Sequence, residues 1–209
     1  MENEMQMMPQ KATPTNMPST VVNQTGSKNI SIGRAESVKL IYNILGMPVR
    51  PAGQRPFNTD YYNLFVLYKA NLSDGYFVIQ KDRAPETCYT QKDIWTRYST
   101  LTPEVVEEIK TFPAIIANES TDYGKADENQ LAICAAITDI RSQENGVKVH
   151  FQPLFYLSQN QLIQAAGKLA LISGYELNHT HWAIKNMNLF EELLEAKIDL
   201  MLPEELSGQ

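Results

Sequence analysis

The stretch LAICAAITDIRSQENGVKVHFQPL, residues 131–154, decides the fold because it predicts a long β-hairpin. Its centre is Asn145-Gly146, a pair that favours the positive φ angles of a two-residue hairpin turn. Before the turn lies an apolar run, and after it residues 147–152 alternate apolar and polar side chains, the period of a half-buried strand. The stretch therefore predicts two antiparallel strands with one face toward a core.

The hairpin register follows from the position of this turn. If Glu144 pairs with Val147, Arg141 lies opposite His150 and Ile140 lies opposite Phe151. One face of the hairpin is then buried and the other faces solvent. The predicted buried face holds Ile140, Val149, Phe151, Ala136 and Cys134, and the predicted solvent face holds Asp139, Arg141, Lys148, His150 and Gln152.

Shorter strands and amphipathic helices are predicted on both sides of the hairpin. Residues 61–68, 76–79 and 112–117 are rich in β-branched, aromatic or aliphatic side chains and predict strands, while residues 175–185 are typical of a strand or an extended loop. Polar caps before apolar residues predict helix starts at Thr90, Thr102, Ser158 and Asn188. Because strands and helices do not alternate regularly, a doubly wound parallel sheet is disfavoured. We predict an α+β fold, in which about five short antiparallel strands form a small curled sheet or open β-barrel with helices covering one side.

Composition divides the 209 residues into five predicted parts. The first residues are rich in Met, Pro, Thr, Asn and Gln and have little to bury, which is typical of disorder. The stretch MPVRPAGQRPF holds three prolines and a glycine, which is typical of a linker. The parts are a disordered leader at 1–20, a short β or helical appendage at 21–46, a linker at 47–57, an α+β core domain at 58–200 and an acidic tail at 201–209.

Charge and cysteine content exclude several classes of protein. The chain has 18 Lys and Arg against 24 Asp and Glu, a net charge of −6, and residues 186–209 alone hold six acids and one lysine. The rest is nearly neutral, which makes nucleic acid an improbable partner because phosphate binding needs clustered cations. No apolar stretch approaches the ~18 residues of a membrane span, and a cytoplasmic protein without a membrane partner is expected. Cys88 and Cys134 form no disulfide framework or metal motif, and no phosphate-binding glycine loop is present, so we predict no cofactor.

The three histidines suggest one catalytic alternative. On an extended segment His179 and His181 would point to the same side, and with His150 they would form a zinc site at which Glu176 serves as general base. A metal-dependent hydrolase or nuclease with the catalytic candidates Glu176, His179 and His181 is therefore an alternative. However, the spacing lacks the helical His-Glu-x-x-His pattern, and histidines in a polar stretch such as NHTHW are more often surface or hydrogen-bonded residues. We accordingly expect no metal site.

Four residues are candidates for binding rather than catalysis. Trp182 is one because tryptophan is enriched at binding hot spots, although packing across the sheet end is the more common role. Arg141 and His150 belong to the predicted solvent face of the hairpin, and Lys185 follows the tryptophan. A second alternative is a small-barrel nucleic-acid binder that uses Lys81, Arg83, Arg97 and Lys148 with aromatic neighbours, which the charge balance disfavours.

A composite pattern runs from about residue 60 to residue 200: YYNLFVLY, KDRAPE, LTPEVVEEIKTFPAIIANES, AAITDIR, ENGVKVHFQ and ELNHTHWAIKNMNL. This pattern resembles a family of uncharacterised bacterial proteins, and the segment VVNQTGSKNISIG is similar to the β-forming leaders of some such proteins. The resemblance implies a bacterial intracellular source and a single module, and it implies no chemistry.

The absence of a catalytic motif, the nearly neutral body and the β-prone leader together predict a non-catalytic interaction module. We expect it to bind a protein partner or itself through residues 21–45, since such a segment can pair with a sheet edge. An accessory or sensor component of a mobile element or defence locus is the expected setting. Whether the chain is an enzyme is left open, with a non-enzymatic role favoured.

Overall fold

The computed structural model describes residues 56–85 and 87–203. The predicted leader at 1–20, the appendage at 21–46, most of the linker at 47–57 and most of the tail at 201–209 lie outside these residues. The domain limits expected there stay predictions. In the described ranges, no helix is long and apolar enough to cross a membrane.

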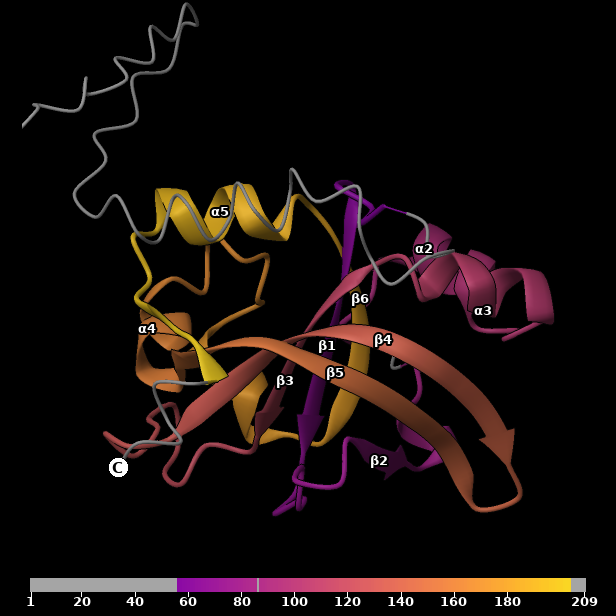
Figure 1. Ribbon diagram of the computed structural model, residues 1–209, viewed down its shortest axis with the longest axis horizontal. Helices are drawn as coiled ribbons and strands as arrows, with labels where there is room; N and C mark the ends of the chain where they lie inside the picture. Colours follow the sequence, from indigo (N-terminus) through magenta and orange to yellow (C-terminus); the bar gives the residue numbers. More distant parts are fainter. Residues whose placement is uncertain (1–55, 86, 204–209) are drawn as a thin grey trace, which may run out of the picture. The chain divides into compact units, whose positions relative to one another are not determined.

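Seven strands form one open sheet in the described part of the chain (Figure 1). Its order is β2-β5-β4-β3-β1-β6, and the short β7 pairs with residues 156–157 of β5, whereas β2 pairs with residues 147–150 at the other end of β5. β1 and β3 are parallel, and all other pairs are antiparallel. The strands are β1 (Tyr61–Leu67), β2 (Tyr76–Ile79), β3 (Pro113–Asn118), β4 (Leu131–Gln143), β5 (Gly146–Ser158), β6 (His181–Asn186) and β7 (Leu200–Met201).

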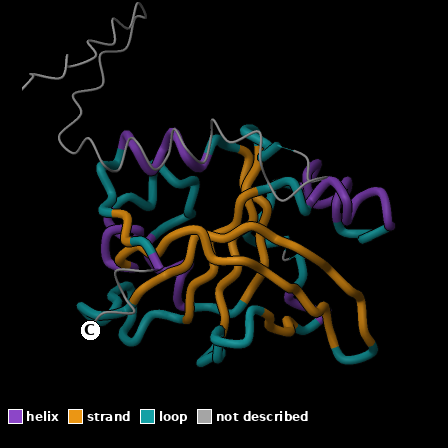
Figure 2. Tube along the Cα trace, in the orientation of Figure 1, coloured by secondary structure: helices purple, strands orange, loops and turns teal. Residues whose placement is uncertain are grey.

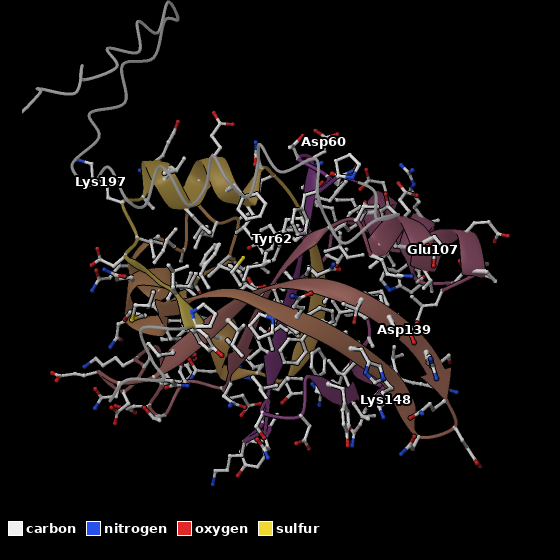
Figure 3. The ribbon with its side chains drawn as sticks, in the orientation of Figure 1. Asp60, Tyr62, Glu107, Asp139, Lys148 and Lys197 are labelled. Atoms are coloured by element: carbon white, nitrogen blue, oxygen red, sulfur yellow. The ribbon has the colours of Figure 1, made fainter. Side chains whose placement is uncertain are left out.

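Helices cover both faces of the sheet (Figures 1 and 2). α4 (Gln159–Gln164) and α5 (Leu189–Glu195) pack on one face, where Leu162 and Phe190 join a core that includes Tyr62 of β1 (Figure 3). On the other face lie α2 (Lys92–Tyr98) and α3 (Pro103–Ile109), which bury apolar side chains in a second core. Two 3-10 helices, η1 (Lys81–Arg83) and η2 (Gly174–Asn178), complete the fold.

The predicted α+β class is confirmed, and three of its details are wrong. The sheet has seven strands rather than about five. It is not purely antiparallel, because the long connection through β2, α2 and α3 returns the chain parallel to β1. The helices do not cover one side only, since that same connection places α2 and α3 on the face opposite α4 and α5.

The hairpin of β4 and β5 forms, but its register differs from the prediction by two residues. Gln143 pairs with Gly146, so Arg141 faces Lys148 and His150 faces Asp139. The turn residues are Glu144 and Asn145, because Gly146 lies in β5 against the backbone of β2, where a Cβ atom would meet the carbonyl oxygen of Ile79. A shift of two residues preserves which side chains face the core.

Two bulges change the buried face farther from the turn. Thr138 is an extra residue in β4 and Leu154 is one in β5, as the register shifts there show. Each bulge exchanges the two faces of its strand. Cys134 therefore lies in the core under α4 and α5, not on the face with Ile140 where it is predicted.

The sheet curls so that β2, its first strand, approaches β1 near the other end of the sheet. The ring of Phe77 in β2 lies 5.0 Å from that of Phe65 in β1, and Phe65 lies 5.1 Å from Trp182 in β6. The first distance joins strands that are far apart in the sheet order, whereas the second joins paired neighbours. A closed barrel would need hydrogen bonding between the edge strands β2 and β6, because β1 is already paired on both sides, with β3 and β6.

Candidate functional site

A cleft of about 550 Å³ lies beside β2 in the curl of the sheet. It also contacts the ends of β1 and β3 and the segment that enters β6. No residue of β5, the paired neighbour of β2, lines it, so the cleft is on the free side of β2. Its lining residues are Leu67, Tyr68, Ala70, Val78, Ile79, Gln80, Arg83, Glu119, Asn178, His179 and Thr180.

The outer backbone edge of β2 faces away from β5. The amide of Phe151 donates to the carbonyl oxygen of Gly75 at 2.9 Å, so the pair before Tyr76 is hydrogen-bonded. Because bonded pairs alternate in antiparallel strands, the N–H and C=O groups of Tyr76 and Val78 point outward. Both residues are exposed, at 36% and 43%. β2 thus presents an accessible strand edge.

The opposite end of the sheet is covered. The amide of Ile184 in β6 donates to Thr90 Oγ1 at 3.1 Å, which occupies one outward donor of this strand. Trp182 and Ile184 are 0% and 1% exposed. We call residues 87–90 the strap. Thr90 is therefore not the predicted helix cap, since α2 begins after Gln91 and the Thr90 side chain accepts from β6 instead.

A buried ionic cluster lies beneath the strap. Glu176 of η2 and His181 and Lys185 of β6 are 2%, 0% and 4% exposed. Glu176 Oε1 is 2.6 Å from Lys185 Nζ and 3.2 Å from His181 Nε2, while Glu176 Oε2 accepts from the amide of Ile172 at 2.7 Å. Lys185 also donates to the carbonyl oxygen of Tyr89 at 3.1 Å, and the Tyr89 ring lies 4.1 Å from that of His181. The cluster ties η2, β6 and the strap together.

Hydrogen-bond geometry assigns one ring proton of His181. His181 Nδ1 lies 2.7 Å from the carbonyl oxygen of His179, which only accepts, so Nδ1 carries a proton. The contact of Nε2 with Glu176 is then a hydrogen bond only if one further proton lies between them. Burial raises the pKa of the Glu176 carboxyl, but the bonds from His181, Lys185 and Ile172 outweigh burial, and the pKa lies below its usual value. Burial lowers the pKa of Lys185, against the opposing effect of Glu176.

The cluster is built for positioning rather than for contact with a ligand. None of its three side chains lines the cleft beside β2 or a second cleft of about 460 Å³ between α4 and the residues after α5. A buried charge is stable only when it is paired and hydrogen-bonded, and both Glu176 and Lys185 are. In this structure the cluster holds the strap against β6.

The structure separates the three histidines. His150 lies on β5, where its ring is 5.5 Å from that of Tyr76. His181 is buried, whereas His179 is exposed and lines the cleft, because β6 begins only at His181 and the two side chains do not follow strand alternation. Across the described ranges, no three His, Cys, Asp or Glu side chains are grouped so that they could hold a metal ion. Of the predicted catalytic residues, Glu176 and His181 are in contact and His179 contributes its carbonyl oxygen.

The predicted binding residues have different environments. Trp182 packs across the sheet end, and its indole N–H donates to Asn63 Oδ1 at 3.1 Å. Lys185 is in the buried cluster. Arg141 is exposed and pairs with Asp139 at 2.5 Å on the outer hairpin, where Figure 3 labels Asp139 and Lys148. Binding by these residues stays a prediction.

The cations proposed for nucleic-acid binding lie on three different elements. Lys81 and Arg83 are in η1, and Arg83 lines the cleft. Lys148 lies on β5 with its ammonium 3.8 Å from the centre of the Tyr76 ring. Arg97 is on α2 and pairs with Glu108 at 2.7 Å. Binding of nucleic acid through these residues stays a prediction.

Two features of the surface were not recognised in the sequence. The open edge of β2 depends on pairing with β5 across 70 residues, which no local pattern reports. A stacked pair of exposed tyrosines, Tyr123 and Tyr175, also joins distant segments. The only local signal is the sequence Asp-Tyr-Gly-Lys at 122–125, which by itself predicts a solvated turn.

Comparison of the chain with known protein families, with curated proteins and with solved structures finds no match. The resemblance to a family of uncharacterised bacterial proteins therefore stays a prediction. Function has to be argued from the geometry of the molecule itself.

Proposed function

We propose that this protein is a non-catalytic interaction module that pairs the outer edge of β2 with an extended polypeptide segment. The observation that carries the proposal is the contrast between the two ends of the sheet. The edge of β6 is covered by the strap, whereas the edge of β2 is exposed and borders the cleft. Main-chain hydrogen bonds to such an edge supply affinity, and pockets beside it supply specificity.

The cleft suits the side chains of an added strand. A segment paired with β2 would point alternate side chains into the curl of the sheet and toward solvent. Leu67, Ala70 and Ile79 line the cleft with apolar groups, and polar groups surround them. An occupant that alternates apolar and polar residues fits this lining.

Residues 21–45 of the chain are the proposed strand donor. They include Ile30-Ser31-Ile32, which alternates as the cleft requires. Pairing with β2 of a second copy would produce self-association, and a segment of the same type in another protein would produce a complex. An accessory or sensor role beside a mobile element or defence locus is part of the proposal.

Light scattering coupled to size-exclusion chromatography of the full-length protein tests self-association. Val78→Pro removes an outward N–H while leaving the bonds to β5 in place, since proline is tolerated on a free strand edge. Val78→Thr is the matched control, because it keeps the N–H and the β-branched shape. We expect concentration-dependent association that Val78→Pro abolishes and Val78→Thr retains.

Replacing Ile30 and Ile32 with aspartate tests the donor in the same assay. These substitutions should reduce association as strongly as Val78→Pro if residues 21–45 supply the strand. Association that is unchanged by Val78→Pro would overturn the assignment of the β2 edge. The contact between Glu176 and His181 is the observation that favours the hydrolase alternative, and stoichiometric zinc in chelator-free protein would support that alternative instead.

A further inference from the structure

A second surface, separate from the edge of β2, is formed by the stacked tyrosines. Tyr123 lies in the loop between β3 and β4, and Tyr175 lies in η2. Their ring centroids are 4.3 Å apart with an interplanar angle of 25°, and the residues are 67% and 47% exposed. Ile172, also 67% exposed, precedes Tyr175 by three residues. Because the two rings stack on each other, they form a joined aromatic surface rather than isolated exposed side chains, and exposed apolar patches can mark interaction sites.

The pair is held rigidly by the backbone around it. Asn178 accepts from the amide of Gly124 at 2.9 Å and donates to the carbonyl oxygen of Asp122 at 3.0 Å. Asp122 and Lys125 exchange two backbone hydrogen bonds of 3.1 Å each. Gly124 has a φ of +69°, and a Cβ atom there would lie 2.5 Å from the Tyr175 ring, so only glycine lets this ring rest on the turn. Because the rings are already ordered, a ligand would bind them at little entropic cost.

The charge around the tyrosines favours a cationic ligand. The loop carries three exposed acids, Asp122, Asp127 and Glu128, and one exposed lysine, Lys125. Two of these carboxylates, Asp122 and Asp127, accept only backbone amides of their own loop among the described hydrogen bonds. Phosphate groups would be repelled here, which disfavours nucleic acid although bases also stack on tyrosine. Cations are attracted both by the carboxylates and by the faces of the rings.

The geometry points to an arginine-bearing segment of a partner polypeptide as the ligand of this surface. A guanidinium is planar and stacks on an aromatic face, which an ammonium does not do. Its N–H groups would extend past the ring edge toward Asp122, beside Tyr123 in the turn. The inference does not depend on the edge of β2.

Nuclear magnetic resonance titration of the ¹⁵N-labelled full-length protein tests this assignment. The probe is an acetylated and amidated peptide of glycine and serine around one arginine, and its control replaces arginine with citrulline, which is neutral and nearly isosteric. We expect saturable shifts of the Tyr123, Gly124 and Tyr175 amides with the arginine peptide. Affinity should be about twofold to fivefold lower with the citrulline peptide, as the loss of one exposed cation–π contact implies.

Variants and alternative ligands complete the test. Tyr123→Ser should abolish the shifts at Gly124 and Tyr175, while Tyr68→Ser, at a tyrosine of 64% exposure beside the cleft, should leave them unchanged. Equal affinity for the two peptides would overturn the inference. Larger shifts at the same amides with an oligothymidine probe would overturn it in favour of nucleic acid, and shifts that depend on protein concentration without peptide would assign the surface to a second copy.

Discussion

Lys185→Met should destabilise the protein strongly, because it leaves a carboxylate buried without its cation. The substitution removes the 2.6 Å contact with Glu176 and the 3.1 Å bond to the Tyr89 carbonyl oxygen. Removing one member of a buried pair typically costs about 3–5 kcal/mol. His181 still contacts Glu176, so we expect the lower end, about 3 kcal/mol, or roughly 6–12 °C in Tm for a chain of this size.

Urea unfolding followed by tryptophan fluorescence measures this loss, since Trp182 is fully buried in the native state. Lys168→Met is the matched control, because its ammonium also donates to a carbonyl oxygen, that of Glu195 at 3.0 Å, but at an exposed site. It should change the free energy of unfolding by less than about 1 kcal/mol.

The double variant Glu176→Gln with Lys185→Met separates charge from packing. Replacing both members removes the unpaired buried charge, so the double variant should be more stable than the sum of the single losses by about 1–3 kcal/mol. If Lys185→Met instead unfolds within about 1 kcal/mol of the wild type and the two losses add, the cluster contributes no coupled stabilisation. The reasoning from its burial would then be refuted.

Three other perturbations test neighbouring parts of the fold. The pKa of Glu176 lies below its usual 4.5, so its carboxylate stabilises the fold above that pH, and this stabilisation is lost as the pH falls through the folded-state pKa. Glu176→Gln should therefore flatten the decline of the unfolding free energy at low pH, as measured by urea unfolding. Asn118→Ala removes side-chain bonds to both the N–H and C=O of Ala70, at 2.7 and 3.2 Å, and should lower the unfolding free energy by about 1–3 kcal/mol. An unchanged urea midpoint would contradict this prediction. Gly146→Ala should push β2 from β5, because the added Cβ atom would meet the carbonyl oxygen of Ile79, and the Ile79 amide should then exchange faster. Unchanged exchange of this amide would contradict the close approach of Gly146 to β2.

Local sequence patterns predicted the elements whose determinants are local. The alternation after Asn145 identified the hairpin, and its predicted solvent face is not buried. Helix caps were predicted correctly at Thr102, whose side chain accepts from the amide of Val105, and at Asn188, which accepts from that of Glu191. In each case the decisive contact spans three residues or fewer, so the sequence window contains it.

Features that depend on distant contacts could not be predicted in this way. Thr138 and Leu154 look like ordinary strand residues, yet as bulges they exchange the buried faces and move Cys134 to the other core. Glu176 and His181 could be singled out by residue type, but their contact with Lys185 depends on the transition from η2 to β6. Thr90 shows the limit most clearly, because its hydroxyl contacts the amide of Ile184, 94 residues away, rather than capping a helix.

We expect the ionic cluster to fix the position of the strap more than it adds to net stability. Apolar side chains could fill the same volume with equal or greater stability, but they would not fix the strap at one position. The directional bonds from Lys185 to Glu176 and to the carbonyl oxygen of Tyr89 do fix it. The amide of Ile184 is protected by Thr90 of the strap, so its hydrogen exchange reports whether the strap stays in place. In the double variant Glu176→Gln with Lys185→Met, this amide should exchange faster than in the wild type, even after correction for the difference in global stability. Unchanged protection would mean that packing alone positions the strap. Accelerated exchange would show that the cluster keeps the Ile184 amide of β6 covered by the strap.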